Sequence, residues 1–179
     1  MLLYGKPLAE KMEADLRQQV HSTFWDQERF VAILFFGNDA SSQVYVKYKQ
    51  LYGEKIGLPA LVFGQGKGSS SDPELTALLQ QTQRDKKLIL ALIHRLNREE
   101  RCVGIIIQLP LPPEFQPYKN ELLSAIAPAK DLDGLNGTLI GKNFLEMIDF
   151  LPATPKAVIS LLDYYKLGNL RGKRVAVLW

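Results

Sequence analysis

The sequence predicts an α/β fold in which helices cover a parallel β-sheet, and three observations lead to that class. Short apolar segments that suit single strands recur at residues 30–36, 60–63 and 102–107. Segments with the apolar spacing of helices lie between them. Turns rich in glycine, proline or polar residues separate the two kinds of segment. Strands that alternate with helices are typical of parallel βαβ units, which form layered sheets.

The first two elements are a helix and a buried strand. Residues 6–20 predict an amphipathic helix because apolar side chains recur every four residues, at Leu8, Met12, Leu16 and Val20. Residues 30–36 are apolar throughout, which is typical of a strand covered on both of its faces.

The next helix is predicted to begin after a turn at residues 37–39. Asp39, Ser41 and Ser42 have side chains that can cap it. It should stop at Gly57, because glycine suits the left-handed backbone that commonly ends a helix. A second strand is then expected at residues 60–63.

The segment GQGKGSSSDP, at residues 64–73, suggests a phosphate-binding loop at first sight. A dinucleotide-binding fingerprint, however, needs a strand before the glycines, a helix that opens on them and a third glycine at a fixed offset. The spacing here does not meet these requirements. A flexible turn is therefore the favoured interpretation, and a phosphate loop is the alternative.

The rest of the chain continues the alternation. Helical spacing resumes from Asp72 and becomes strongly apolar at 88–96. The elements predicted after it are a buried strand at 102–107, a helix at 119–126, a long loop at 128–141 and a helix at 152–165. The last residues, 170–179, indicate a turn that feeds a new strand.

Composition argues against several classes of function. A net charge of +3 over 179 residues, without a block of like charge, argues against a nucleic-acid partner. No apolar run is long enough to span a membrane, and the N-terminus reads as a helix rather than a signal peptide. Cys102 is the only cysteine, so no disulfide within the chain and no thiolate metal cluster is expected. The expected location is cytoplasmic.

Chemistry is expected beyond the carboxyl ends of the strands, where open parallel sheets bind ligands. In the helix after residue 36, Lys49 lies about 40° from Tyr45 around the axis, whereas Lys47 lies about 200° from it. If Tyr45 faces a cleft, Lys49 therefore faces the same cleft. An amine drawn out of water beside aromatic rings becomes a usable proton acceptor. The alternative is a half-exposed helix surface with solvated lysines.

Two further segments carry polar residues that local structure does not obviously require. Gln108 ends the strand at 102–107, and its amide can donate to a ligand and accept from an amine; tying down the adjacent loop is the alternative. Asp131 and Asp133 lie two residues apart in KDLDG, without further ligands at the spacing a metal needs. We expect one of these carboxylates to bind an amino-substituted heterocycle and the other to cap the loop.

Taken together, these segments resemble one known family. SSQVYVKYK, GIIIQLPLP, PAKDLDGLNG and PATPKAVISLL, in that order, are similar to the bifunctional methylenetetrahydrofolate dehydrogenase/methenyltetrahydrofolate cyclohydrolase family. The ordered pair QLPLP and KDxDG is highly specific, and the resemblance runs from about residue 3 to residue 177. It implies a folate-binding catalytic domain at residues 1–150. Residues 151–179 would then be a linking helix and the first strand of an NADP-binding Rossmann domain.

The resemblance also implies roles for individual residues. Two match catalytic positions: the lysine that follows the motif tyrosine by four, Lys49, and the glutamine that supports it, Gln108. Four are expected to contact the substrate: Tyr45, which packs on the folate ring, Asp133, which anchors the pterin, and Leu109 and Pro110 of QLPLP.

The implied activity is one-carbon folate interconversion. In the family, 5,10-methylenetetrahydrofolate is oxidised by NADP, and the 5,10-methenyltetrahydrofolate that forms is hydrolysed to 10-formyltetrahydrofolate. No glycine-rich loop for NADP follows LRGKRVAVL in this sequence, so the cyclohydrolase half is the firmer expectation for these residues. A folate-binding or interaction module without turnover is the alternative. Family members commonly form homodimers, chiefly through the Rossmann domain.

Overall fold

A three-stranded parallel sheet lies at the centre of the computed structural model, which describes residues 2–24, 28–37, 39–64, 85–147 and 150–177. The strands are β1 (Phe30–Leu34), β2 (Ala60–Phe63) and β3 (Cys102–Ile107). Their order is β2-β1-β3, so the first strand is central. The predicted α/β class and the place of each of these strands are confirmed, although β1 stops two residues before its predicted end.

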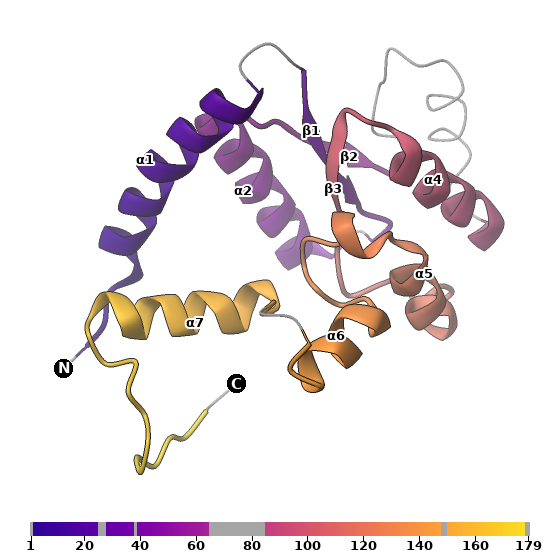
Figure 1. Cartoon of the computed structure of the whole chain (residues 1–179). Helices are drawn as coiled ribbons and strands as arrows, with labels where there is room; N and C mark the ends of the chain where they lie inside the picture. Colours follow the sequence, from indigo (N-terminus) through magenta and orange to yellow (C-terminus); the bar gives the residue numbers. More distant parts are fainter. Residues whose placement is uncertain (1, 25–27, 38, 65–84, 148–149, 178–179) are drawn as a thin grey trace.

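Helices cover both faces of this sheet (Figure 1). The described α-helices are α1 (Gly5–Phe24), α2 (Ala40–Ile56), α4 (Lys86–Arg98), α5 (Lys119–Ala125), α6 (Gly137–Phe144) and α7 (Ala153–Tyr164). On one side α1 packs against α2, and on the other α4 packs against α5. α6 adjoins α5, and α7 crosses below the sheet to meet α1. The region beneath the sheet is thus bordered by α6 and α7.

Two apolar cores lie on opposite faces of the sheet, because successive residues of a strand point to opposite sides. Ala32 and Leu34 of β1 pack in the core on the side of α4 and α5. α4 buries four side chains there at helical spacing: Ile89, Leu92, Ile93 and Leu96. On the other face, Ile33 packs with Val46 of α2 and with Ile106 of β3. This second contact sets α2 against the sheet.

The two ends of α2 match the sequence prediction. Asp39 is the N-cap, and its carboxylate accepts a hydrogen bond from the backbone N–H of Ser42 at 2.8 Å. Hydrogen bonds from the Ser41 hydroxyl and from Ser42 hold the pKa of Asp39 below its ordinary value. Gly57 ends the helix in the left-handed conformation, with φ of 79°. These caps determine where α2 begins relative to the end of β1.

Two predicted elements are wrong. The loop expected at 128–141 includes the start of α6, because the Asn136 side chain accepts a hydrogen bond from the backbone N–H of Thr138 and so caps a helix. The strand expected after Gly172 is not formed, and residues 173–177 are exposed. A strand needs a hydrogen-bonded neighbour, and none of the three described strands pairs with this segment.

Other predictions are refined or lie outside the described residues. The first helix is longer than predicted, and none of its side chains is fully buried because it packs on other helices instead of on the sheet. Residues 65–84, which hold most of GQGKG and the helix start expected at Asp72, are not described. Among the helices that are described, none combines the length and the apolar character needed to cross a bilayer.

Candidate active site

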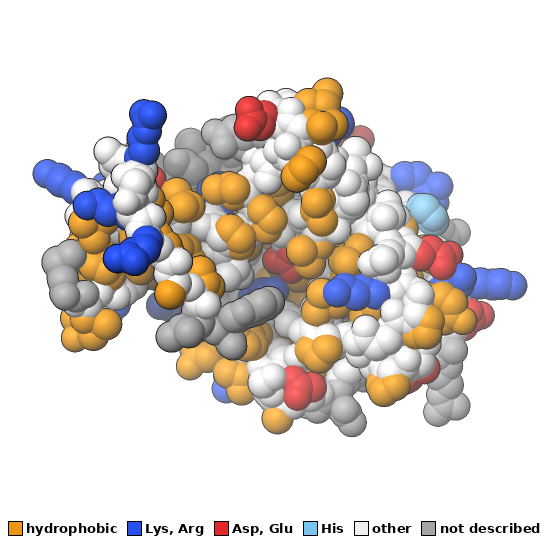
Figure 2. Space-filling model, turned by 90° about the horizontal axis from the view of Figure 1, so that it is seen from below, with side chains coloured by type: hydrophobic (Ala, Val, Ile, Leu, Met, Phe, Trp, Pro, Cys, Tyr) orange, Lys and Arg blue, Asp and Glu red, His pale blue; other side chains and the backbone are white. Residues whose placement is uncertain are grey.

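Three polar segments meet at the carboxyl ends of the strands. The strands run downward in Figure 1, so Figure 2, which views the molecule from below, looks onto those ends. The surface is hollowed there, and acidic and basic side chains lie among apolar ones. β1 leads into α2, Gln108 directly follows β3, and the KDLDG loop lies beside β3 through a bridge between Ile105 and Asp131.

Lys49 and Gln108, which come from different elements, are in direct contact. The Lys49 Nζ donates to the Gln108 Oε1 at 3.1 Å, although the two residues lie 59 positions apart in the sequence. Both side chains are half buried. The backbone N–H of Gln108 donates to the carbonyl oxygen of Leu34, so its main chain is fixed by the sheet. The two residues predicted to act together are therefore neighbours.

The carbonyl oxygen of Leu109 orients this pair. The Gln108 Nε2 donates to it at 2.9 Å, which leaves the amide oxygen of Gln108 facing Lys49. The Ser42 hydroxyl donates to the same carbonyl at 3.4 Å, and Ser42 is 2% exposed. Sequence reasoning assigned Ser42 only a place at the start of a helix. Its position three residues before Tyr45, on a similar side of α2, is the signal that could have linked it to the site.

Asp133 lies half buried near Lys49. Burial raises the pKa of its carboxyl group above the ordinary value, the Lys49 ammonium opposes that rise, and the Asp131 carboxylate adds to it. A carboxylate that has lost part of its hydration binds N–H donors more strongly than one in open water. Asp133 is therefore suited to an amino-substituted heterocycle.

Asp131, by contrast, is turned into its own loop and is 4% exposed. Its Oδ1 accepts from the backbone N–H of Gly134 at 3.0 Å, and its Oδ2 accepts from that of Asn136 at 2.7 Å. The loop-capping role predicted for one of the two aspartates is confirmed for Asp131.

An apolar cavity of about 430 Å³ lies beside Lys49, between α2 and the sheet. Tyr48 and Tyr52 line it from α2, and Leu132 lines it from the KDLDG loop. Tyr45 precedes Lys49 by one turn and is 64% exposed, so its ring is open to a ligand. Tyr48 and Tyr52 are not among the predicted site residues, although helical spacing places both within one turn of Lys49.

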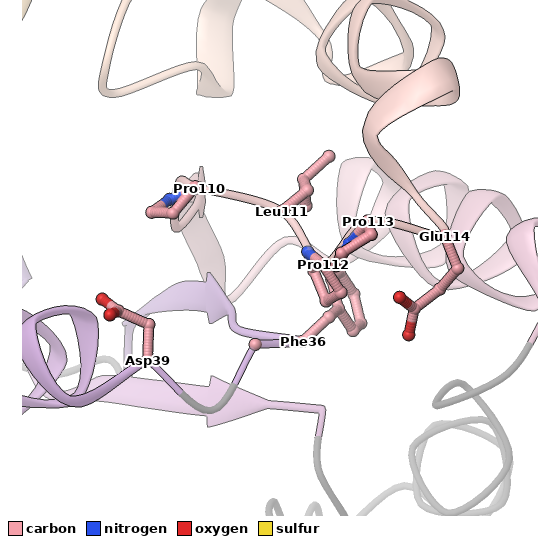
Figure 3. Close-up of a pocket in the computed structure, with 8 residues that line it drawn as sticks. Phe36, Asp39, Pro110, Leu111, Pro112, Pro113 and Glu114 are labelled. Carbon is pink, nitrogen blue, oxygen red and sulfur yellow. The ribbon is translucent and has the colours of Figure 1, made fainter.

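A second cavity, of about 440 Å³, opens between the turn after β1 and the segment after β3 (Figure 3). Pro110, predicted to lie beside the substrate, lines this cavity, and so does Phe36 from the turn after β1. Asp39 and Glu114 place carboxylates at opposite ends. Like charges repel, so this cavity disfavours anionic groups. The predicted residues Lys49 and Pro110 thus belong to different hollows.

The described residues offer neither a metal site nor a reactive thiol. Among them, no three His, Cys, Asp or Glu side chains are grouped so that they could hold a metal ion. Cys102 is buried in β3, and burial raises the pKa of its thiol, as in a packing residue. The polar groups that the described residues place at the carboxyl ends of the strands include the Lys49 amine, the Gln108 amide and the Asp133 carboxylate.

Comparison with known proteins identifies the family. The family model for the catalytic domain of tetrahydrofolate dehydrogenase/cyclohydrolase matches residues 3–133. The chain belongs to this family. The bifunctional protein FolD of Chlamydia felis is 35% identical over 178 residues, which cover 99% of this chain and 55% of the relative. The chain therefore spans about half the length of the curated relatives it matches.

Solved structures of the family share the fold. The bifunctional FolD enzyme, a methylenetetrahydrofolate dehydrogenase/cyclohydrolase, from Campylobacter jejuni has a TM-score of 0.76 and 31% identity, covering 93% of this chain and 54% of that one. The Trypanosoma brucei enzyme, solved with NADP cofactor and inhibitor, has a TM-score of 0.72 and 24% identity, covering 92% and 52%. The second likeness supports the fold alone. The family inferred from the four sequence motifs is confirmed.

Proposed function

We propose that this chain binds 5,10-methenyltetrahydrofolate and hydrolyses it to 10-formyltetrahydrofolate, as the cyclohydrolase part of the family's activity. The observation that carries the proposal is the 3.1 Å contact between Lys49 and Gln108, which holds an amine at the carboxyl end of the sheet near Asp133. Membership of the family supports the choice of substrate. In this proposal, residues 1–150 form the folate-binding domain and residues 151–179 lead into the next one.

Tyr45 and Asp133 bind the substrate in this proposal. Tyr45 presents an exposed ring one helical turn from Lys49, and a flat pteridine stacks favourably on such a ring. The Asp133 carboxylate accepts hydrogen bonds from the amino group and a ring N–H of the pterin. Leu109 contributes an apolar wall beside the substrate, and Pro110, which lines the neighbouring cavity, borders the substrate at its edge. The substrate's bridge carbon then lies near Lys49.

Hydrolysis needs water to add to the carbon that bridges N5 and N10 of the cationic substrate. The Lys49 ammonium first gives up a proton to solvent, and the amine that remains accepts one proton from the attacking water as the carbon–oxygen bond forms. The bond from the carbon to N5 then breaks. The hydroxyl group becomes the formyl carbonyl by losing its proton, and N5 takes up a proton. The sum of these steps consumes one water and releases one proton, and Gln108 keeps the Lys49 amine in place throughout.

The dehydrogenase half of the family's activity needs NADP as hydride acceptor, and the N-termini of the two helices α2 and α4 do not suit its phosphates. Helix N-termini are the usual place for a nucleotide phosphate. At α2 that place is taken by the Asp39 carboxylate, and at α4 by the Asp85 carboxylate, which accepts from the backbone N–H of Lys87. Both charges repel phosphate. We therefore assign no step of hydride transfer to the described residues.

The proposal is tested by measuring binding and turnover separately. A folate analogue is titrated into the protein to measure affinity, and the loss of 5,10-methenyltetrahydrofolate absorbance is followed against the spontaneous rate. NADP reduction with 5,10-methylenetetrahydrofolate is assayed in parallel. Saturable hydrolysis supports the proposal, with or without NADP reduction. Binding without accelerated hydrolysis contradicts it and supports a folate-binding module instead.

The cytoplasmic location, which is expected from the composition, and the homodimer, which the resemblance to the family implies, are proposals as well. Analytical ultracentrifugation of the purified protein tests the second of them. A single species with the mass of one chain at all concentrations would contradict a homodimer.

A further inference from the structure

The KDLDG loop is attached to the rest of the molecule on both sides of Asp133. At its start, the Lys130 ammonium donates to the carbonyl oxygens of Leu96 at 3.0 Å and Glu99 at 2.8 Å, which lie at the C-terminal end of α4. A cation at that end of a helix also interacts favourably with the helix dipole. The loop therefore begins from a fixed point.

The next attachment is to β3. The backbone N–H of Leu132 donates to the carbonyl oxygen of Ile105 at 3.4 Å. The Leu132 side chain lies over Gly104, where a Cβ atom would overlap it, so only glycine leaves room for this close approach. Asp133 thus follows directly after a residue that is docked on the sheet.

The far end of the loop is held by Asn136. Its Nδ2 donates to three carbonyl oxygens at the end of α5, those of Leu123, Ser124 and Ile126, at 3.5, 3.3 and 2.9 Å. Asn136 is 2% exposed. Two anchored segments therefore flank Asp133, and the connection between them decides where its side chain points.

Asp131 makes that connection. Its carboxylate accepts from the backbone N–H groups of Gly134 and Asn136, so it closes a ring of main chain in which Asp133 is a central member. Gly134 has φ of 69°, a left-handed turn that redirects the chain within this ring. Hydrogen bonds from main-chain N–H groups to a buried carboxylate are among the stronger ones in proteins.

We propose that Asp131 is a positioning residue that holds the Asp133 carboxylate beside Lys49 by closing the main chain on either side of it. The resemblance to the family assigns a role to Asp133 alone. The geometric part of this inference stands on the loop's own contacts, and only its consequence for folate rests on the proposed function.

A ligand-free experiment tests the geometric part. The titration of the Asp133 carboxyl group is followed by carbon-13 NMR in the wild type and in Lys49→Met. Because the Lys49 ammonium lowers the pKa of Asp133, its removal should raise that pKa. In an Asp131→Asn background, Asp133 is released from its place, and the same Lys49→Met substitution should no longer move the pKa of Asp133.

The response of the Asp133 pKa to Lys49→Met reports the position of the Asp133 carboxylate relative to Lys49, and it does not depend on the charge of Asp131. The Asp131 charge is absent both from Asp131→Asn and from Asp131→Asn with Lys49→Met. Its direct effect on the pKa of Asp133 therefore cancels when these two variants are compared. If Lys49→Met raises the pKa of Asp133 equally in both backgrounds, the proposal is overturned. Should Asp131→Asn not fold, Asp131→Ser, whose single short hydroxyl cannot accept from both Gly134 and Asn136, provides the same comparison.

Asn97→Ala is the matched control. Asn97 also holds a connecting segment through two hydrogen bonds to the main chain. Its Nδ2 donates to the carbonyl oxygen of Ala125 at 2.8 Å, and its Oδ1 accepts from the backbone N–H of Ala127 at 3.0 Å. Both of these hydrogen bonds go to residues 125 and 127, outside the ring that residues 131–136 form around Asp133. The variant should lose stability as Asp131→Asn does, yet keep the full response of Asp133 to Lys49→Met. Loss of that response in Asn97→Ala would assign the effect to general loosening and overturn the proposal.

Folate kinetics test the consequence. Loss of a charge-assisted hydrogen bond corresponds to roughly tenfold or more in affinity. Asp131→Asn should therefore raise the KM for 5,10-methenyltetrahydrofolate about tenfold and leave kcat within about twofold, because Asp133 binds the substrate in ground and transition state alike. A wild-type KM in Asp131→Asn counts against the inference. Absence of turnover in the wild type would sink the proposed function, while the NMR result would still decide the positioning role.

Discussion

Replacing Gln108 by leucine removes two hydrogen bonds while changing the side-chain volume little. One is donated by the Lys49 Nζ at 3.1 Å, and the other is donated by Gln108 to the carbonyl oxygen of Leu109 at 2.9 Å. Lys49 is only half buried, so water can replace its lost partner, and the free energy of unfolding should fall by about 1 kcal/mol. Water cannot, however, replace Gln108 in fixing the orientation of the Lys49 amine.

The expected effect on catalysis is larger than the effect on folding. A hydrogen bond to a charged group is worth about 1.5–3 kcal/mol, which corresponds to roughly a tenfold to hundredfold change in kcat/KM if the bond is needed to place the amine. Hydrolysis of 5,10-methenyltetrahydrofolate, followed by absorbance at several substrate concentrations, measures this change. Most of the loss is expected in kcat, because Gln108 acts on the catalytic group.

Gln50→Leu is the matched control for this substitution. Gln50 neighbours Lys49 on α2, and its Nε2 donates to the carbonyl oxygen of Ala60 at 3.4 Å, away from Gln108. It should lose a similar amount of stability and keep kcat within about twofold of the wild type. If Gln108→Leu hydrolyses the substrate as fast as Gln50→Leu does, the supporting role assigned to Gln108 is refuted.

Two further predictions concern the pH dependence of stability and the packing of α2. Burial raises the pKa of Asp133 in the folded state above its ordinary value of 3.8. The ionisation of Asp133 therefore lowers the stability of the protein as the pH rises from 3.8 through the raised pKa. Below pH 3.8 the carboxyl group is protonated in both the folded and the unfolded state, and this cost is absent. Asp133→Asn should therefore be at least as stable as the wild type at neutral pH and should lose that advantage in acid, although it binds folate poorly. Thermal unfolding measured across this pH range tests the prediction. A variant that is less stable than the wild type at neutral pH would contradict the burial argument. Gly53→Ala should destabilise the protein in urea titrations, because its Cβ would lie 2.6 Å from the carbonyl oxygen of Leu58. The overpacking should cost about 1–3 kcal/mol, which exceeds the gain of about 1 kcal/mol from the better helix propensity of alanine. An unchanged urea midpoint would argue against this close approach.

The elements that the sequence predicts well have local causes. The strands at 60–63 and 102–107 are short apolar runs between turns, and α2 carries its cap residue Asp39 and its terminating Gly57 within the segment itself. The failures concern partners that lie elsewhere. Residues 173–177 have the composition of a strand, but a strand forms only with a neighbour in a sheet.

The site was predictable in part because helix geometry and motif order are both visible in a sequence. Helical spacing separates Lys49 from Lys47 but cannot show what Lys49 meets. Its contact with Gln108 joins residues 59 positions apart, and only the resemblance to a family linked the two. The burial of Ser42 against Leu109 depends on how the segments pack, so no local pattern revealed it. The sequence predicted that one of Asp131 and Asp133 caps the loop, but only the structure shows that it is Asp131.

The central claim is that the amine of Lys49 performs the hydrolysis. The most direct measurement compares the rate of 5,10-methenyltetrahydrofolate hydrolysis in Lys49→Met and Lys47→Met, with folate-analogue binding measured in both. Lys47 is exposed on α2 and provides a control with the same chemical change. We predict that Lys49→Met binds the analogue but hydrolyses the substrate no faster than the spontaneous rate, while Lys47→Met retains wild-type hydrolysis. Hydrolysis by Lys49→Met at the wild-type rate would contradict the claim.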